Sequence, residues 1–187
     1  MGKKGEIKQY HEMLQKYIDN KEFVKIFRTI CDKEEDLSGF ILKMTKDFLL
    51  IQLDREFMLD GYAIIRLDGF DSIRCNKYDK TQRKIFKSEG ILDMVGISND
   101  INLISWETII KDLKKQDYHI IIENIKKDYL DFFIGPIKKI SKKSVSIHNY
   151  DPAGKLYKKP TNVKLETIKN VKFGDRYSTI FRKYITQ

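Results

Sequence analysis

The sequence predicts a mainly β protein with flanking helices, built from two tandem small five-stranded barrels that are each preceded by a helix. Three observations lead to this prediction: an internal repeat, short strand-like segments bounded by turn residues, and two amphipathic stretches with helical spacing. A chain of 187 residues is long enough to bury a core in one ordinary domain or in two small ones.

The repeat consists of three pairs of similar segments. These are 23–30 with 118–125, 37–51 with 133–147, and 67–74 with 165–172. In this alignment Gly39 meets Gly135 within a strand-like segment of each copy. We expect both strands to bend sharply there, because a glycine inside a strand often marks a bend or a close backbone approach.

Each copy is expected to contain five short strands. In the first copy they are 23–30, 38–45, 48–55, 62–67 and 70–76, and Asp60-Gly61 between two apolar runs predicts a hairpin turn. In the second copy Ser144, Ser146 and His148 alternate with Val145 and Ile147, which is typical of a strand with one polar face. Pro152-Ala-Gly154 and residues 159–162 bound a longer loop.

Two helices are expected around these strands. Ile7, Tyr10, Leu14, Tyr17 and Ile18 recur at helical spacing. Ser105 can cap a second helix, whose apolar face is Trp106, Ile109, Ile110 and Leu113, and we expect Trp106 to be structural. A short helix is predicted over 81–87. The expected divisions are an N-terminal helix (1–22), a first barrel (23–80), a helical connector (81–117) and a second, basic barrel (118–187).

The formal net charge of +9 is concentrated in the last 70 residues, which hold 15 basic and 6 acidic side chains. A localised excess indicates either an anionic partner or a solvated lysine-rich surface. No apolar run approaches the roughly 20 residues of a membrane helix, and the N-terminus leads into no signal core. Cys31 and Cys75 are too few for a disulfide framework or a zinc site, so we expect a cytoplasmic protein.

Residues 39–51, which read Gly-Phe-Ile-Leu-Lys-Met-Thr-Lys-Asp-Phe-Leu-Leu-Ile, resemble the first signature of the Sm-like family of SH3-type small barrels. Residues 64–74 stand in the place of the second signature, and 57–67 resemble a stretch of uncharacterised bacterial Sm-like proteins. The resemblance covers about 23–76 and, more weakly, 118–176. It implies tandem small barrels and, because Sm-like proteins form rings on uridine- or adenine-rich RNA, a possible RNA ligand and oligomer.

The sequence departs from the family at its RNA-binding turn, where an Asp is usually followed by a Met or His and then by an Asn. Here Asp47 is followed by apolar residues, and the second copy has Ser141-Lys-Lys-Ser144 instead. The Arg-Gly pair of the second signature is also absent, since Cys75 follows Arg74. The family pocket is therefore not carried over residue by residue.

No catalytic residues, metal ligands or cofactor are predicted. His11, His119 and His148 are isolated, without metal-ligand spacing. The acidic run of Asp32 and residues 34–36 is expected to be a solvated loop. An enzyme built from scattered Asp, His and Cys side chains is a third hypothesis.

The leading hypothesis is a non-enzymatic binding module that holds single-stranded RNA on its second barrel, because lysines neutralise phosphates and aromatic rings stack on unpaired bases. The candidate residues are Lys138, Lys139, Lys142, Lys143, Tyr150, Lys155, Tyr157, Lys158 and Lys159. The sequence leaves open whether the turn 141–144 and the loop 150–162 project from the same end. The alternative is a protein-interaction or scaffold module without nucleic acid, which uses a strand edge of the first barrel.

Overall fold

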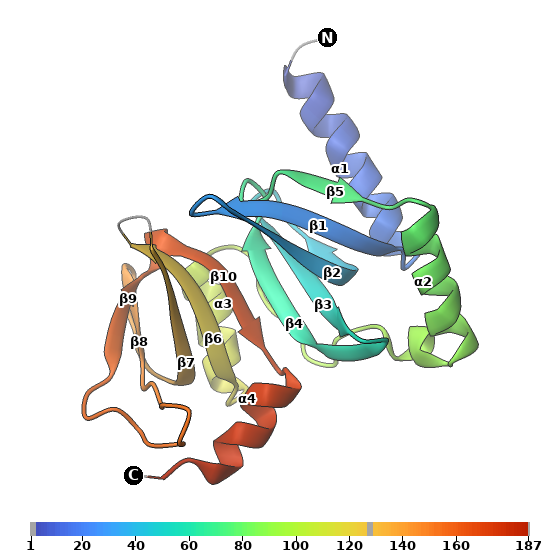
Figure 1. Ribbon diagram of the computed structural model, residues 1–187. Helices are drawn as coiled ribbons and strands as arrows, with labels where there is room; N and C mark the ends of the chain where they lie inside the picture. The colour runs from blue at the N-terminus through green and yellow to red at the C-terminus, as the bar shows by residue number, and fades with distance from the viewer. Residues whose placement is uncertain (1–2, 127–128, 187) are drawn as a thin grey trace.

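The structure is a computed structural model that describes residues 3–126 and 129–186, and over these ranges it contains four α-helices and ten β-strands (Figure 1). The helices are α1 (Lys3–Asp19), α2 (Lys77–Ser88), α3 (Trp106–Lys115) and α4 (Arg176–Phe181). The strands are β1 (Phe23–Ile30), β2 (Lys33–Met44), β3 (Phe48–Arg55), β4 (Met58–Arg66), β5 (Ser72–Arg74), β6 (His119–Lys126), β7 (Tyr129–Ile140), β8 (Ser144–Ile147), β9 (Thr161–Lys164) and β10 (Ile168–Phe173).

The prediction of two separate five-stranded barrels is wrong. All ten strands form one open antiparallel sheet in the order β5-β1-β2-β3-β4-β10-β6-β7-β8-β9. The two sets of strands are joined where β4 pairs with β10, with Val171 opposite Ile64 and Phe173 opposite Tyr62. The reason lies in the run 63–65 of β4, which is completely buried. A strand that is apolar on both faces is an interior strand, so its edge takes another strand instead of facing solvent.

The strand order repeats within the sheet. The first unit, β1 to β5, has the order β5-β1-β2-β3-β4, and the second unit, β6 to β10, has the equivalent order β10-β6-β7-β8-β9. Ile41 lies opposite Ile51 in the first unit, and Ile137 lies opposite Ile147 in the second. Each pair is followed by a shift of register. The segments aligned in the sequence therefore occupy equivalent places in the sheet.

Gly39 and Gly135 lie where the long strands β2 and β7 change partners. Their φ angles are 150° and 153°, a conformation that side chains disfavour. A Cβ atom would lie 2.0 Å from the carbonyl oxygen of Gln52 at the first glycine and 2.2 Å from that of His148 at the second. A side chain at either glycine would therefore be obstructed by the neighbouring backbone, as the interpretation of these glycines requires.

Both predicted amphipathic helices are present and cover the sheet. Leu14 of α1 is fully buried against the first unit. The apolar face of α3 packs against strands of both units, and the ring centroids of Trp106 and Phe48 are 4.9 Å apart. The structural role expected for Trp106 is therefore confirmed. The helix α2 is longer than the one expected over 81–87.

Two local predictions are corrected, and one helix was not predicted. The β3–β4 turn is at Glu56 and Phe57, which have φ angles of 50° and 63°, whereas Gly61 lies inside β4. The glycine is needed there because a Cβ atom would lie 2.4 Å from the backbone nitrogen of Asp175. Residues 34–36 belong to β2 instead of a loop. The helix α4 was not expected, although Asp175 caps it by accepting from Ser178 N at 2.8 Å.

Candidate nucleic-acid interface

The candidate lysines of the second unit form two groups. Lys138, Lys139, Lys142 and Lys143 lie at the end of β7 and in the β7–β8 turn, whereas Lys155, Lys158 and Lys159 lie in the β8–β9 loop; all seven are exposed. The turn and the loop are at opposite ends of β8, because the strand enters from one and leaves into the other. With four residues, β8 separates them by about 13 Å. The single concentrated patch that the same-end arrangement would give is therefore absent.

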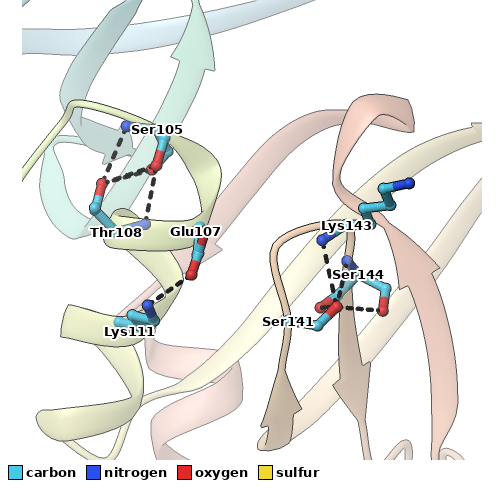
Figure 2. Close-up of polar contacts among 7 residues, drawn as sticks. All are labelled: Ser105, Glu107, Thr108, Lys111, Ser141, Lys143 and Ser144. Carbon is cyan, nitrogen blue, oxygen red and sulfur yellow. Dashed lines mark hydrogen bonds and ion pairs between the residues drawn. The ribbon is translucent and has the colours of Figure 1, made fainter.

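The β7–β8 turn has a fixed backbone. Ser141 Oγ accepts hydrogen bonds from the backbone nitrogens of Lys143 at 3.3 Å and Ser144 at 3.0 Å, and Ser141 N donates to Ser144 O at 2.8 Å. Figure 2 shows this turn together with the start of α3. The side chain of Lys142 and the first residues of α3 line one groove of about 320 Å³. The turn therefore presents its two lysines from a defined place beside the helix.

The helix α3 is anchored at both ends. At its start, Ser105 Oγ accepts from Thr108 N at 3.2 Å and Thr108 Oγ1 accepts from Ser105 N at 3.0 Å, while Glu107 and Lys111 pair at 2.6 Å (Figure 2). At its end, Lys114 Nζ donates to the carbonyl oxygen of Lys138 at 2.5 Å. This contact brings α3 lysines to the surface formed by β7.

Lys114 and the exposed Lys115 therefore belong with the candidate lysines, although the sequence analysis did not include them. Their sequence signal was the basic last turn of a helix whose apolar face is buried. The end of α3 and the turn end of β7 together carry six lysines.

The outer face of β7, β8 and β9 is polar. Lys139 lies opposite Ser146, and Ser146 lies opposite Asn162, so these three side chains form one row across three strands. Ser144 and Lys164 form the next row. The alternation expected for residues 144–147 is confirmed, since Val145 and Ile147 are fully buried. None of the five outer residues is acidic.

The equivalent rows of the first unit have a different environment. There the register gives Lys43–Leu50–Ile64 and Phe48–Arg66. Leu50 and Ile64 are completely buried, because α3 and the second unit pack on this face. In the second unit no described element covers the equivalent face of β7, β8 and β9, which explains why its residues are polar.

The two candidate tyrosines differ in exposure. Tyr157 has 51% of its surface exposed. Tyr150 is only 4% exposed and its ring stacks on Phe181, with centroids 5.1 Å apart. Burial also raises the pKa of the Tyr150 hydroxyl. Tyr150 is therefore a core residue of the loop, and only Tyr157 offers an aromatic surface.

The seven candidate lysines are not neutralised by the fold. None of them forms an ion pair with a carboxylate within residues 3–126 and 129–186. Lys164 on the outer face pairs with Glu166 at 3.8 Å, but both side chains are about three-quarters exposed. Such an exposed pair contributes little, so a bound phosphate can compete for this lysine.

Comparisons with protein-family models, with curated proteins and with solved structures found no match.

Among the described residues, no three or more His, Cys, Asp or Glu side chains gather where they could hold a metal ion. None of the described helices is long and apolar enough to cross a bilayer. His119 has a pKa lowered to about 4 by burial, by Arg182 and by Lys138, so at neutral pH it is an uncharged, partly buried side chain.

Proposed function

We propose that this protein is a non-enzymatic binding module whose second unit holds single-stranded RNA through its exposed lysines. The observation that carries the proposal is the contact between Lys114 and Lys138, which joins the lysines of α3 to those of β7 and the β7–β8 turn. Like charges on one surface repel each other and favour an anionic ligand. The Sm-like resemblance makes RNA the first ligand to test.

The test is fluorescence anisotropy with a labelled oligouridylate of about twelve nucleotides, an oligoadenylate and a matched DNA. We expect dissociation constants of about 1–100 μM at physiological salt. The affinity should fall steeply between about 50 and 200 mM salt, because each lysine that binds a phosphate displaces counterions. Reversing the turn charges in K142E/K143E should reduce affinity by at least about tenfold.

The matched control is K84E/K87E, which makes the same change of charge at two exposed lysines of α2, far in sequence from the β7–β8 turn. If both variants lost affinity equally, the effect would come from net charge and not from the site. A wild-type protein that binds none of the probes at low salt would overturn the proposal.

The protein-binding alternative has less support. Its strand edge would have to be β5, which has three residues, since β4 is already paired with β10. Short edge strands are poor templates for an added strand. An apolar groove of about 400 Å³ does lie between the β3–β4 hairpin and α4, lined by Met58, Tyr177 and Ile180 among others. No observation identifies an occupant for it.

A further inference from the structure

We propose that a single strand of RNA crosses the outer face of β7, β8 and β9, from Lys142 and Lys143 in the turn to Lys158 and Lys159 in the loop, with Tyr157 stacking on a base. The inference rests on the proposed function. It adds the path of the strand, a second contact region and a stacking residue.

The surface between the two lysine groups suits a nucleic-acid backbone. The row Lys139–Ser146–Asn162 lies across the three strands at a level between the turn and the loop, so a strand of RNA that follows β8 passes over it, and it offers an ammonium, a hydroxyl and an amide group. Hydroxyl and amide side chains bind phosphate and sugar oxygens in nucleic-acid complexes. Since none of these three side chains is acidic, a strand can pass over them without charge repulsion.

The separation of the two groups determines how long the ligand must be. The four residues of β8 span about 13 Å, and the turn and loop extend beyond both ends of the strand. A ligand that reaches both groups therefore has several nucleotides, and a very short oligonucleotide can touch only one group at a time. Affinity should rise with oligonucleotide length until both groups are occupied.

Tyr157 is held in place by its backbone while its ring remains exposed. Its nitrogen donates to Asn149 O at 2.9 Å, and its carbonyl oxygen accepts from His148 Nε2 at 2.8 Å. An exposed ring on a fixed backbone loses little freedom on binding, and stacking on such a ring requires an unpaired base. The site therefore fits a single strand better than a duplex.

The loop that carries Lys158 and Lys159 is anchored to the body of the protein. Leu156 N donates to Thr186 O at 3.2 Å, and Thr186 N donates to Gly154 O at 2.9 Å. The carboxylate of Asp151 accepts from Lys155 N at 3.0 Å within the loop. The two lysines thus start from a positioned segment, at the end of the face opposite to the turn.

The experiment measures anisotropy of labelled oligouridylates of about four and about twelve nucleotides with the full-length protein. Asn162→Glu places an acid on the path, and we expect it to weaken binding of the longer probe by about tenfold. Tyr157→Ala should weaken the same probe by about 5-fold to 100-fold, the usual range for loss of one base-stacking ring. K158Q/K159Q should lower the salt slope by about 1.4, since each contact to a single strand contributes about 0.7.

Matched controls come from the helix α2. Tyr78→Ala removes an exposed tyrosine, with 64% of its surface accessible, and K84Q/K87Q removes two exposed lysines. Both controls should bind like the wild type. All substituted side chains are on the surface, so we expect every variant to fold. Thermal unfolding of each variant shows whether a loss of binding comes from a loss of folding.

The outcomes separate the path from the proposed function. If the wild type binds and K142E/K143E does not, while Asn162→Glu, Tyr157→Ala and K158Q/K159Q bind normally, the RNA stays at the turn end and the path is wrong. Equal binding of a duplex, unaffected by Tyr157→Ala, would also overturn it. A wild type that binds no probe defeats both proposals together.

Discussion

Arg28 and Glu123 form a buried ion pair between the two units, with 2.6 Å between Arg28 Nη2 and Glu123 Oε2. Arg28 belongs to β1 and is 2% exposed, whereas Glu123 belongs to β6 and is 6% exposed. Glu35 contacts the same guanidinium at 2.9 Å, and Lys172 contacts the second oxygen of Glu123 at 2.6 Å. The β1–β2 hairpin of the first unit is thereby linked to β6 of the second unit, beside the β4–β10 pairing, since Glu123 lies opposite Asn170 and Asn170 lies opposite Ile65.

The substitution Glu123→Gln should lower the free energy of unfolding by about 3 kcal/mol, because it leaves Arg28 buried without its closest partner. Urea unfolding measures the loss. The control is Glu166→Gln, which removes an exposed ion pair with Lys164 and should change stability by less than about 0.5 kcal/mol. Equal effects of the two substitutions would show that the buried pair does not fasten the units.

The same carboxylate should make stability depend on acid pH. Burial alone would raise the pKa of Glu123, but Lys172 and Arg28 together lower it below its ordinary value of 4.5. A carboxylate with a lowered folded-state pKa stabilises the protein above its unfolded pKa and loses that contribution as the pH falls through the folded value. The stability difference between wild type and Glu123→Gln should therefore be largest near neutral pH and shrink below about pH 4.5. A constant difference down to acid unfolding would contradict this.

Much of the sheet could be predicted from the sequence, because alternation and turn residues act locally. β1 and β3 have the expected bounds, and Gly39 and Gly135 mark the expected positions. The joining of the units depends on long-range pairing. The sequence signal for this joining was the apolar run 63–65, since such a run indicates an interior strand. The β3–β4 turn was misplaced because Glu56 and Phe57 adopt a conformation more typical of glycine or asparagine.

The candidate interface was predictable in part. Exposure of the seven lysines follows from residue type, since charged side chains are seldom buried. The row Lys139–Ser146–Asn162 needs the pairing register, which one sequence does not give. The burial of Tyr150 depends on Phe181 in α4, an element the sequence analysis did not predict. The exposure of single charged residues could therefore be predicted from the sequence, whereas contacts between residues distant in sequence could not.

Alanine at either repeat glycine should destabilise the protein strongly. At Gly39 and Gly135 the new Cβ atom would meet a backbone carbonyl oxygen at 2.0 Å and 2.2 Å, so the neighbouring backbone must move. We expect each substitution to cost at least about 3 kcal/mol, which is large for a single methyl group. Chemical denaturation measures the cost. Gly96→Ala is the control, because nothing lies within 4 Å of its Cβ position, and it should change stability by less than about 0.5 kcal/mol.

Removing the charge of Asp54 should stabilise the protein at neutral pH. Burial raises the pKa of this carboxyl to about 6, and a hydrogen bond from the backbone of Phe57 offsets only part of the effect. One carboxyl oxygen, Oδ1, is buried without a hydrogen-bond partner within the described residues. The folded-state pKa lies above the unfolded value of 3.8. The contribution of the protonated Asp54 carboxyl to the stability of the fold is therefore complete below pH 3.8 and is lost as the pH rises through about 6.

Asp54→Asn keeps an oxygen that can accept the bond from Phe57 and carries no charge to desolvate. We expect it to raise the free energy of unfolding at pH 7 by about 1 kcal/mol, less than the full pKa shift implies because the side chain is only half buried. Near pH 4 the wild-type carboxyl is largely protonated in the folded state, so the advantage should disappear there. Urea unfolding at the two pH values tests the sign directly, and a variant that is less stable than the wild type at pH 7 would show that the Asp54 charge is needed by a neighbour.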